Sequence, residues 1–363
     1  MGAHTMRLTL STISSNLIDT MKALSSKHIL ALFAKVLAFC LILALGLGFL
    51  QSALLPPAAS TDSWPGYLRQ DKNTVDVLFV GNSHAECTFA PMQIYQETGV
   101  ISWVLKSGGI NTRQKLAYLE EALKTQHPKL VVFEVYGFEI PTKNTDYRNA
   151  SAFMRMPDGI PKISAIFATS EVTATPSLLL PLIRYHSRIF ESPEVPVISG
   201  LQSTGGALAL TDYGSSNINE MLNSANASPI QRLTKQQLDE NTSYLERAFK
   251  LANKHGCQLA FAVSPLLDPT LKAGCEQIKK RIADDQNLND VELFDMNDYF
   301  QSMGLRQADF RDLSHLYLTG QTKASKWFAN TVLPRYGINQ ATALTPVQKQ
   351  WWDEQSSAWL REY

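Results

Sequence analysis

The sequence lacks the features by which several large classes of protein are recognised. Its 33 Lys and Arg residues balance its 33 Asp and Glu residues, and it has no long basic stripe. A nucleic-acid-binding surface needs an excess of positive charge, so DNA and RNA are excluded as main partners. No Gly-x-Gly-x-x-Gly or P-loop pattern follows an expected strand, which disfavours a nucleotide-binding protein. Internal repeats are also missing.

Cysteine is scarce, and its spacing excludes a common kind of metal site. The four residues, Cys40, Cys87, Cys257 and Cys275, form no Cys-x-x-Cys or Cys/His pattern of the kind that binds structural zinc. We expect neither a metal nor an organic cofactor. Cys257 and Cys275 could form a disulfide in an extracytoplasmic domain. Two small buried thiols are the alternative.

One uncharged hydrophobic run, residues 36–55, is long enough to cross a membrane. At a rise of about 1.5 Å per residue it matches a hydrocarbon core of about 30 Å. The positive-inside rule places residues 1–35 in the cytoplasm and everything after Pro56 outside, because three lysines precede the run (Lys22, Lys27 and Lys35). A cleaved signal peptide is the alternative, but it would have a shorter hydrophobic region of roughly 7–15 residues.

The rest of the chain predicts a linker, one large domain and a tail. Residues 56–73 are rich in Pro, Ser and charge, which is typical of a linker. A domain is expected over residues 74–340, with an insertion at about 141–229, and residues 341–363 are expected to be a C-terminal tail. The insertion has a regular apolar period only around residues 178–189. Since long irregular segments are often functional, we expect it to cover or border the functional site.

Five short apolar runs predict the strands of a parallel sheet buried on both faces. Between them Leu and Ala recur every three or four residues, most clearly in 112–126 and 236–255, which predicts helices. This alternation predicts a three-layer α/β/α sandwich with a parallel sheet, preceded by one transmembrane helix. The expected strands are residues 75–80, 101–105, 130–135, 258–263 and 291–294.

The first expected strand leads into Gly81-Asn82-Ser83. Small residues allow a sharp turn there, so the Ser83 hydroxyl can stand exposed at the carboxyl edge of the sheet, where open α/β folds place their ligand sites. Free N–H groups of a following helix would favour negative charge near that hydroxyl. An ordinary helix-capping serine is the alternative interpretation.

A second polar cluster near the carboxyl terminus contains Asp312 and His315. Their spacing of three lets one turn of chain present both side chains to a common point, with the carboxylate orienting the imidazole. Such a base makes a serine hydroxyl an effective nucleophile. The carboxylate of Asp309, six residues before His315, is the second choice. Ser83, His315 and Asp312 are therefore the candidate catalytic residues.

These two segments resemble a known family. Gly81-Asn82-Ser83-His84 is similar to the first block of SGNH/GDSL hydrolases, and Asp312-x-x-His315 is similar to their last block, in the family's order. The resemblance covers about residues 75–335 and implies a flavodoxin-like SGNH fold. It also implies that Ser83 is the nucleophile, His315 the general base and then acid, and Asp312 the orienting carboxylate.

The family's middle blocks are matched only in part. Ser107-Gly108-Gly109 resembles the second block, which implies an oxyanion hole made by the N–H groups of Ser83 and Gly109, with Gly108 as second choice. Tyr136-Gly137-Phe138-Glu139 lacks the Asn of the third block, so one oxyanion donor is missing or replaced. Two further residues are candidates for substrate binding, His84 and His186. Surface, capping or packing roles are their alternatives.

The anchor and the Gly-x-Ser-His block together resemble the DltD-like and alginate-acetylation-like members of the family. This implies an extracytoplasmic serine esterase or O-acyltransferase that adds or removes acyl groups on a cell-surface polysaccharide or teichoic-type polymer, through an acyl-Ser83 intermediate. The alternative is a non-catalytic binding partner of an integral membrane O-acyltransferase. The expected partners are the acylated polymer or acyl carrier, the membrane through the N-terminal helix, and an integral membrane O-acyltransferase.

Overall fold

The computed structural model describes residues 26–56, 63–190, 204–214, 217–228, 230 and 232–362. The chain forms two compact units. One contains helix α2 (Ser26–Leu54) and the short helix η1 (His186–Phe190), which contact each other. The other contains the sheet and all remaining elements.

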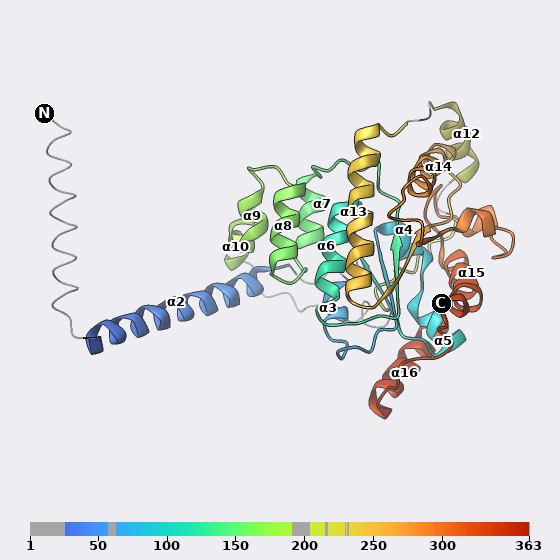
Figure 1. Ribbon diagram of the computed structural model, residues 1–363. Helices are drawn as coiled ribbons and strands as arrows, with labels where there is room; N and C mark the ends of the chain where they lie inside the picture. Colours follow the sequence, from blue (N-terminus) through green and yellow to red (C-terminus); the bar gives the residue numbers. More distant parts are fainter. Residues whose placement is uncertain are drawn as a thin grey trace, which may run out of the picture. The chain divides into compact units, whose positions relative to one another are not determined.

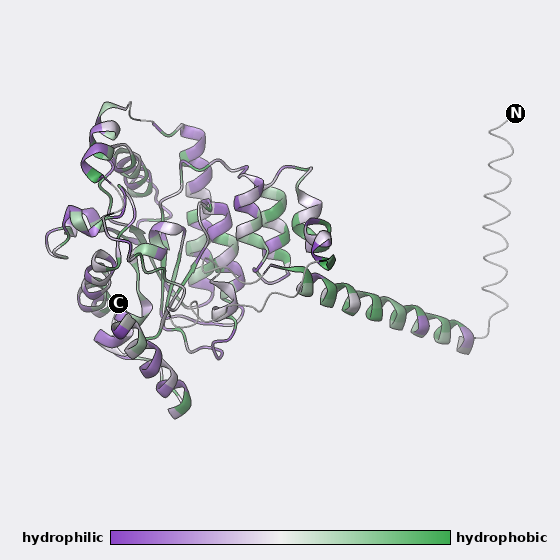
Figure 2. Cartoon of the chain, turned by 180° about the vertical axis from the view of Figure 1, so that it is seen from behind, coloured by the Kyte–Doolittle hydropathy of each residue, from purple (hydrophilic) through white to green (hydrophobic). Residues whose placement is uncertain are grey.

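Helix α2 has the length and composition of a membrane span. Its stretch His28–Leu54 has a mean hydropathy of 2.6, and none of its most apolar window is buried. Figure 2 shows that hydrophobic residues predominate along this helix. Helix α2 begins at Ser26, earlier than the run predicted at residues 36–55. Residues 1–25 of the expected cytoplasmic segment lie outside the described part of the chain.

The sheet has five parallel strands in the order β2-β1-β3-β4-β5. All five expected strands are confirmed, as is the α/β class. Strand β1 pairs with β2 on one side and β3 on the other, so the winding direction of the chain reverses at β1. In open α/β sheets, ligands bind beside such a reversal, outside the carboxyl ends of the strands. The strands are β1 (Val77–Gly81), β2 (Ser102–Lys106), β3 (Leu130–Glu134), β4 (Gln258–Val263) and β5 (Glu292–Asp295).

Helices cover both faces of the sheet (Figure 1). One face packs against α5, α15 and η4, where the rings of Phe79, Phe89 and Phe328 contact one another. Helices α6 and α13 contact strands β1 and β4 and also pack on each other. The helices so far named are α4 (Ser83–Thr88), α5 (Pro91–Thr98), α6 (Thr112–Ala122), α13 (Lys235–Lys254), α15 (Leu318–Trp327) and η4 (Phe328–Val332).

Further helices of the second unit follow β4 and β5. These are α14 (Pro269–Ala283), η2 (Met296–Tyr299), η3 (Gln307–Asp309) and η5 (Leu333–Tyr336). Helix α14 follows β4 and begins at the carboxyl side of the sheet, where Asp268 caps it by accepting hydrogen bonds from the N–H groups of Thr270 and Leu271.

The insertion at 141–229 is more regular than its sequence indicates. Its described residues form α7 (Asp146–Phe153), α8 (Ile160–Thr169), α9 (Thr175–Leu179), α10 (Pro181–Tyr185) and α12 (Ile218–Ala227), whereas residues 191–203 lie outside the described part. With 5 to 10 residues each, these helices are too short to show a clear apolar period. Proline in the first turn or a polar cap starts several of them, as with Pro161 in α8 and Thr145 before α7.

Both segments flanking the predicted domain contribute packed structure. Within the expected linker, α3 (Trp64–Tyr67) buries two aromatic rings against Trp103 and Tyr118, while residues 57–62 lie outside the described part. The expected tail forms α16 (Pro346–Glu362), which packs on α5 and accepts a hydrogen bond of 2.7 Å from Tyr95 at Asp353. Buried aromatic residues therefore extend the domain at both ends.

All four cysteines are free thiols. Cys257 and Cys275 are buried separately, so the disulfide alternative is not formed.

Candidate functional site

Ser83 is placed by a tight turn at the end of β1. Asn82 caps helix α4, since its side-chain oxygen accepts the N–H of His84 at 3.0 Å. Gly81 is required there, because a Cβ would lie 2.4 Å from Cβ of Ala85 and 3.0 Å from Cβ of Glu134. Ser83 is then the first residue of α4 and is half-buried at the carboxyl edge of the sheet.

The structure brings the three candidate catalytic residues into one hydrogen-bonded chain. Oγ of Ser83 lies 2.8 Å from Nε2 of His315, across 232 positions of sequence. Nδ1 of His315 lies 2.9 Å from each carboxylate oxygen of Asp312. A proton on Nδ1 satisfies the carboxylate, which leaves Nε2 to accept the hydrogen bond from the serine hydroxyl.

The loop that carries Asp312 fixes its charge and orientation. Its carboxylate accepts the N–H of Ser314 at 2.8 Å and that of His315 at 2.9 Å. Partial burial alone would raise the pKa of Asp312, but the hydrogen bond and charge of His315, with the bonds from Ser314, lower this pKa to about 2. Asp312 is therefore a carboxylate at any physiological pH.

Asp309, the second choice for this carboxylate, has a structural role. It lies 2.8 Å from Nζ of Lys323 and accepts the N–H of Arg306 at 2.7 Å. The bond to Arg306 caps the start of the short helix η3, and the ion pair joins Asp309 to Lys323 of α15, so both carboxylate oxygens are engaged elsewhere than at His315.

His84 lies in the interior and not at the surface or in a cap. Only 4% of it is exposed, and its ring stacks on Tyr136 at 3.7 Å between centroids. The ring of His84 also contacts the ring of His315 edge-on, with 4.9 Å between their centroids. Burial, followed by the charges of His315 and Lys115, lowers the pKa of His84 well below its usual value, so the ring is neutral. Its environment favours packing beneath His315 over the predicted contact with substrate.

The backbone N–H groups of the two expected oxyanion donors are available to bind a substrate oxygen. Among the described residues, neither the Ser83 N–H nor the Gly109 N–H donates a hydrogen bond to the protein. Gly109 has φ of +65°, a conformation that favours glycine, and its carbonyl accepts the side-chain N–H of Asn144 at 2.9 Å. Gly108, the second choice, is exposed. The oxyanion role of these N–H groups remains a prediction.

The turn after β3 is tied to the nucleophile turn by residues that the sequence analysis missed. The side-chain N–H of Asn82 donates to the carbonyl of Tyr136 at 3.2 Å, and Nζ of Lys115 donates to the same oxygen. Lys115 also pairs with Glu134 at 2.8 Å, and both side chains are fully buried. The sequence signal is Glu134 itself, an acidic residue that ends a continuous apolar strand and needs a buried partner.

Arg148 is a second residue that sequence analysis did not single out. A Cβ at Gly109 would lie 2.7 Å from Nε of Arg148. The exposed guanidinium of Arg148 therefore lies directly beside the backbone of Gly109. Within the described residues, Arg148 forms no ion pair. Nothing in its sequence neighbourhood distinguishes it from other surface arginines, because the contact depends on the fold of the insertion.

His186 belongs to η1, in the unit that contains α2 and not in the one that contains Ser83. A contact of His186 with substrate therefore remains a prediction.

Comparison with known proteins gives likenesses to solved structures at low sequence identity. No protein-family model and no curated protein matches the sequence. Among solved structures, a protein assigned as an acylhydrolase from Bacteroides fragilis is 13% identical, with a TM-score of 0.37 over 76% of this chain and 93% of its own. An acetyl xylan esterase from the rumen bacterium Butyrivibrio proteoclasticus is 11% identical, with a TM-score of 0.32 over 73% of this chain and 65% of its own. These likenesses are too distant to carry a functional inference, which rests on the side-chain geometry instead.

Proposed function

We propose that this chain is an SGNH-type serine esterase or O-acyltransferase. One observation carries the proposal: Ser83, His315 and Asp312 form a continuous hydrogen-bonded chain, with distances of 2.8 Å and 2.9 Å. Nucleophile, base and orienting carboxylate in this order are the parts that acyl transfer needs. The Asp312 pKa of about 2 supports the same roles, because an ionised carboxylate stabilises the imidazolium that forms when His315 takes the serine proton.

The reaction follows from the positions of the atoms. Oγ of Ser83 attacks the ester carbonyl carbon while its proton passes to Nε2 of His315. The carbon–oxygen ester bond then breaks, and His315 returns the proton to the leaving alcohol, which leaves an acyl-Ser83 ester. Water or a sugar hydroxyl then attacks the acyl carbon while Nε2 of His315 takes its proton. The bond from the acyl carbon to Oγ breaks, and His315 returns the proton to Oγ of Ser83, which releases the acid or the acylated sugar.

The negative charge on the carbonyl oxygen would be met by the free N–H groups of Ser83 and Gly109. We propose that Arg148 offsets the missing Asn of the third block. Its guanidinium lies on Gly109 without a carboxylate partner among the described residues, so its positive charge is close to one oxyanion donor. A cation at that place stabilises the developing oxyanion electrostatically.

The proposed substrate is an acylated cell-surface polymer, and the proposed location is the outer side of a membrane. Helix α2 supports this location, because it is a candidate membrane span and Lys22, Lys27 and Lys35 lie on the amino side of its uncharged run. An anchored enzyme meets membrane-linked or wall-linked polymers at a raised effective concentration. We therefore expect transfer or hydrolysis on a large substrate to exceed hydrolysis of small soluble esters.

The test uses the full chain purified in detergent. It should hydrolyse p-nitrophenyl acetate slowly, and Ser83→Ala should remove this activity. Ser243→Ala is the control: its exposed hydroxyl, on helix α13, donates to the carbonyl of Glu240 in the same helix and not to a triad residue, and this variant should keep the activity. Equal rates for wild type and Ser83→Ala would reject the enzyme and favour a non-catalytic partner of a membrane O-acyltransferase.

A further inference from the structure

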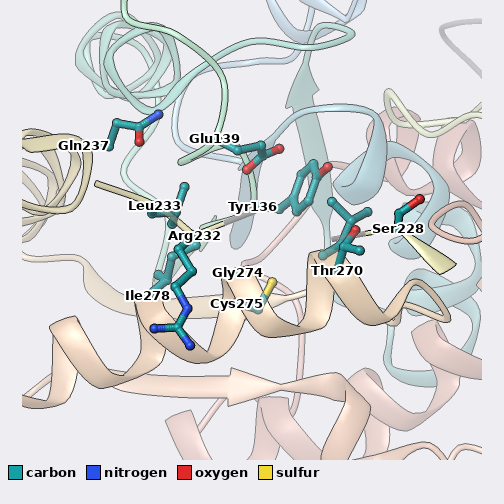
Figure 3. Close-up of a pocket in the computed structure, with 11 residues that line it drawn as sticks. Tyr136, Glu139, Ser228, Arg232, Leu233, Gln237, Thr270, Gly274, Cys275 and Ile278 are labelled. Carbon is teal, nitrogen blue, oxygen red and sulfur yellow. The ribbon is translucent and has the colours of Figure 1, made fainter. Parts of the chain in front are cut away.

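A cavity of about 570 Å³ opens one strand away from the nucleophile (Figure 3). It lies between the turn after β3, which supplies Tyr136 and Glu139, and the first half of α14, which follows β4. Its volume is within the range of about 300–1,000 Å³ that small-molecule sites occupy. The remaining lining residues come from α14 and from the segment around the start of α13: Ser228, Arg232, Leu233, Gln237, Thr270, Leu271, Gly274, Cys275 and Ile278.

One ring joins this cavity to the triad. Tyr136 lines the cavity, and the same ring stacks on His84 at 3.7 Å. His84 in turn contacts His315 at 4.9 Å between ring centroids. Because β1 and β3 are neighbours in the sheet, a ligand lying along the carboxyl edge can reach Ser83 with one group and the cavity with the next.

The lining indicates which chemistry the cavity accepts. It offers one carboxylate, Glu139, and one guanidinium, Arg232, together with hydroxyl and amide groups. The two opposite charges cancel, so the cavity offers no net attraction to the negative charges of a phosphodiester polymer. An acyl chain would remove these polar groups from water without giving them hydrogen bonds, which costs free energy. A neutral ring with many hydroxyls satisfies them, and it can place its apolar face on Leu271 and Ile278.

We infer that this cavity is a subsite for an uncharged glycosyl residue, adjacent to the residue whose ester reaches Ser83. This inference rests on the proposed function and narrows its substrate to a neutral acylated glycan. Binding at such a remote subsite would contribute to turnover of the polymer and contribute nothing to a small ester that does not reach it.

Gly274 allows the subsite to be filled without disturbing the fold. It lines the cavity within helix α14, and a Cβ built on it meets no atom within 4 Å. Leucine is a good helix former, so Gly274→Leu should place an apolar side chain in the cavity and keep the helix intact. Gly274→Ala is the matched control, because it gives the helix the same backbone benefit and leaves most of the cavity open.

The experiment compares these two variants on substrates of three kinds. With an O-acetylated neutral oligosaccharide, Gly274→Leu should lower kcat/KM about 10-fold or more relative to Gly274→Ala. With p-nitrophenyl acetate the two variants should be equal. Equal kcat/KM values on the oligosaccharide would overturn the inference. A selective loss on p-nitrophenyl octanoate would also overturn it and assign the cavity to the acyl chain.

A binding measurement separates this inference from the proposed function. Calorimetric titration of the neutral oligosaccharide into the full Ser83→Ala chain requires no catalysis. Binding that is present in this chain and lost when Gly274→Leu is added supports the subsite, even if no ester is hydrolysed. Binding that Gly274→Leu leaves unchanged, or no binding at all, rejects the subsite and leaves the esterase activity to its own test.

Discussion

Asp312 depends on its neighbours for its charge. Its pKa of about 2 lies below the ordinary 3.8, so the folded state favours the ionised form. A group with a depressed pKa stabilises the fold fully above its unfolded pKa and loses that contribution as pH falls through its folded pKa. The stabilisation from Asp312 should therefore be complete above about pH 4 and decline toward pH 2.

Urea unfolding of the full chain in detergent tests this dependence. At pH 5, well above about 4, the free energy of unfolding of the wild type should exceed that of Asp312→Asn. The difference should shrink as the pH is lowered to about 3 and below. A difference that grows on acidification would show that the carboxylate is not held ionised by His315.

Arg148 offers a residue-scale test of how the oxyanion is stabilised. Arg148→Gln should lower kcat for p-nitrophenyl acetate about 10-fold with little change in KM, because charge stabilisation acts on the transition state. Arg148→Lys should recover part of the loss, since it keeps the charge. A loss that Lys does not recover, or one seen only in KM, would indicate a packing or binding role.

At the scale of elements, the turn between β1 and α4 sets the position of the nucleophile. Gly81→Ala would force Cβ to within 2.4 Å of Ala85. Overpacking of this kind destabilises by about 1–3 kcal/mol, and urea unfolding should detect it. Gly108→Ala is the matched control, because its Cβ meets no atom within 4 Å and the stability should hardly change. Equal stabilities for the two variants would mean that the turn relaxes easily and that Gly81 is not needed.

The strands could be predicted from the sequence because each is buried on both faces and reads as a continuous apolar run. The triad residues could be proposed because each of their motifs is local, and the order of the motifs matches a family. The helices of the insertion could not, since a helix of five to ten residues shows too few turns to reveal an apolar face. Arg148, Lys115 and the cavity depend on contacts between distant segments, which no local pattern records.

At the scale of the whole molecule, the proposed function requires the N-terminus to lie in the cytoplasm and the domain that contains Ser83 to lie on the outer side of the membrane, with α2 crossing it. Alkaline phosphatase fused after Tyr363 of the full chain should be active, because lysines before the apolar run favour a cytoplasmic N-terminus. A green fluorescent protein fused at the same place is the complementary control, and this fusion should not fluoresce. The reverse pattern would place the domain in the cytoplasm and remove cell-surface polymers as substrates.

The proposed function depends on Ser83 being a nucleophile that His315 activates. A fluorophosphonate probe labels only a serine whose proton can be taken by a base, so intact-mass analysis of the full chain tests the claim directly. One adduct is expected, located at Ser83; it should be lost in Ser83→Ala, strongly reduced in His315→Ala and retained in Ser243→Ala. An unlabelled wild-type chain that is folded, or equal labelling of wild type and Ser83→Ala, would contradict it.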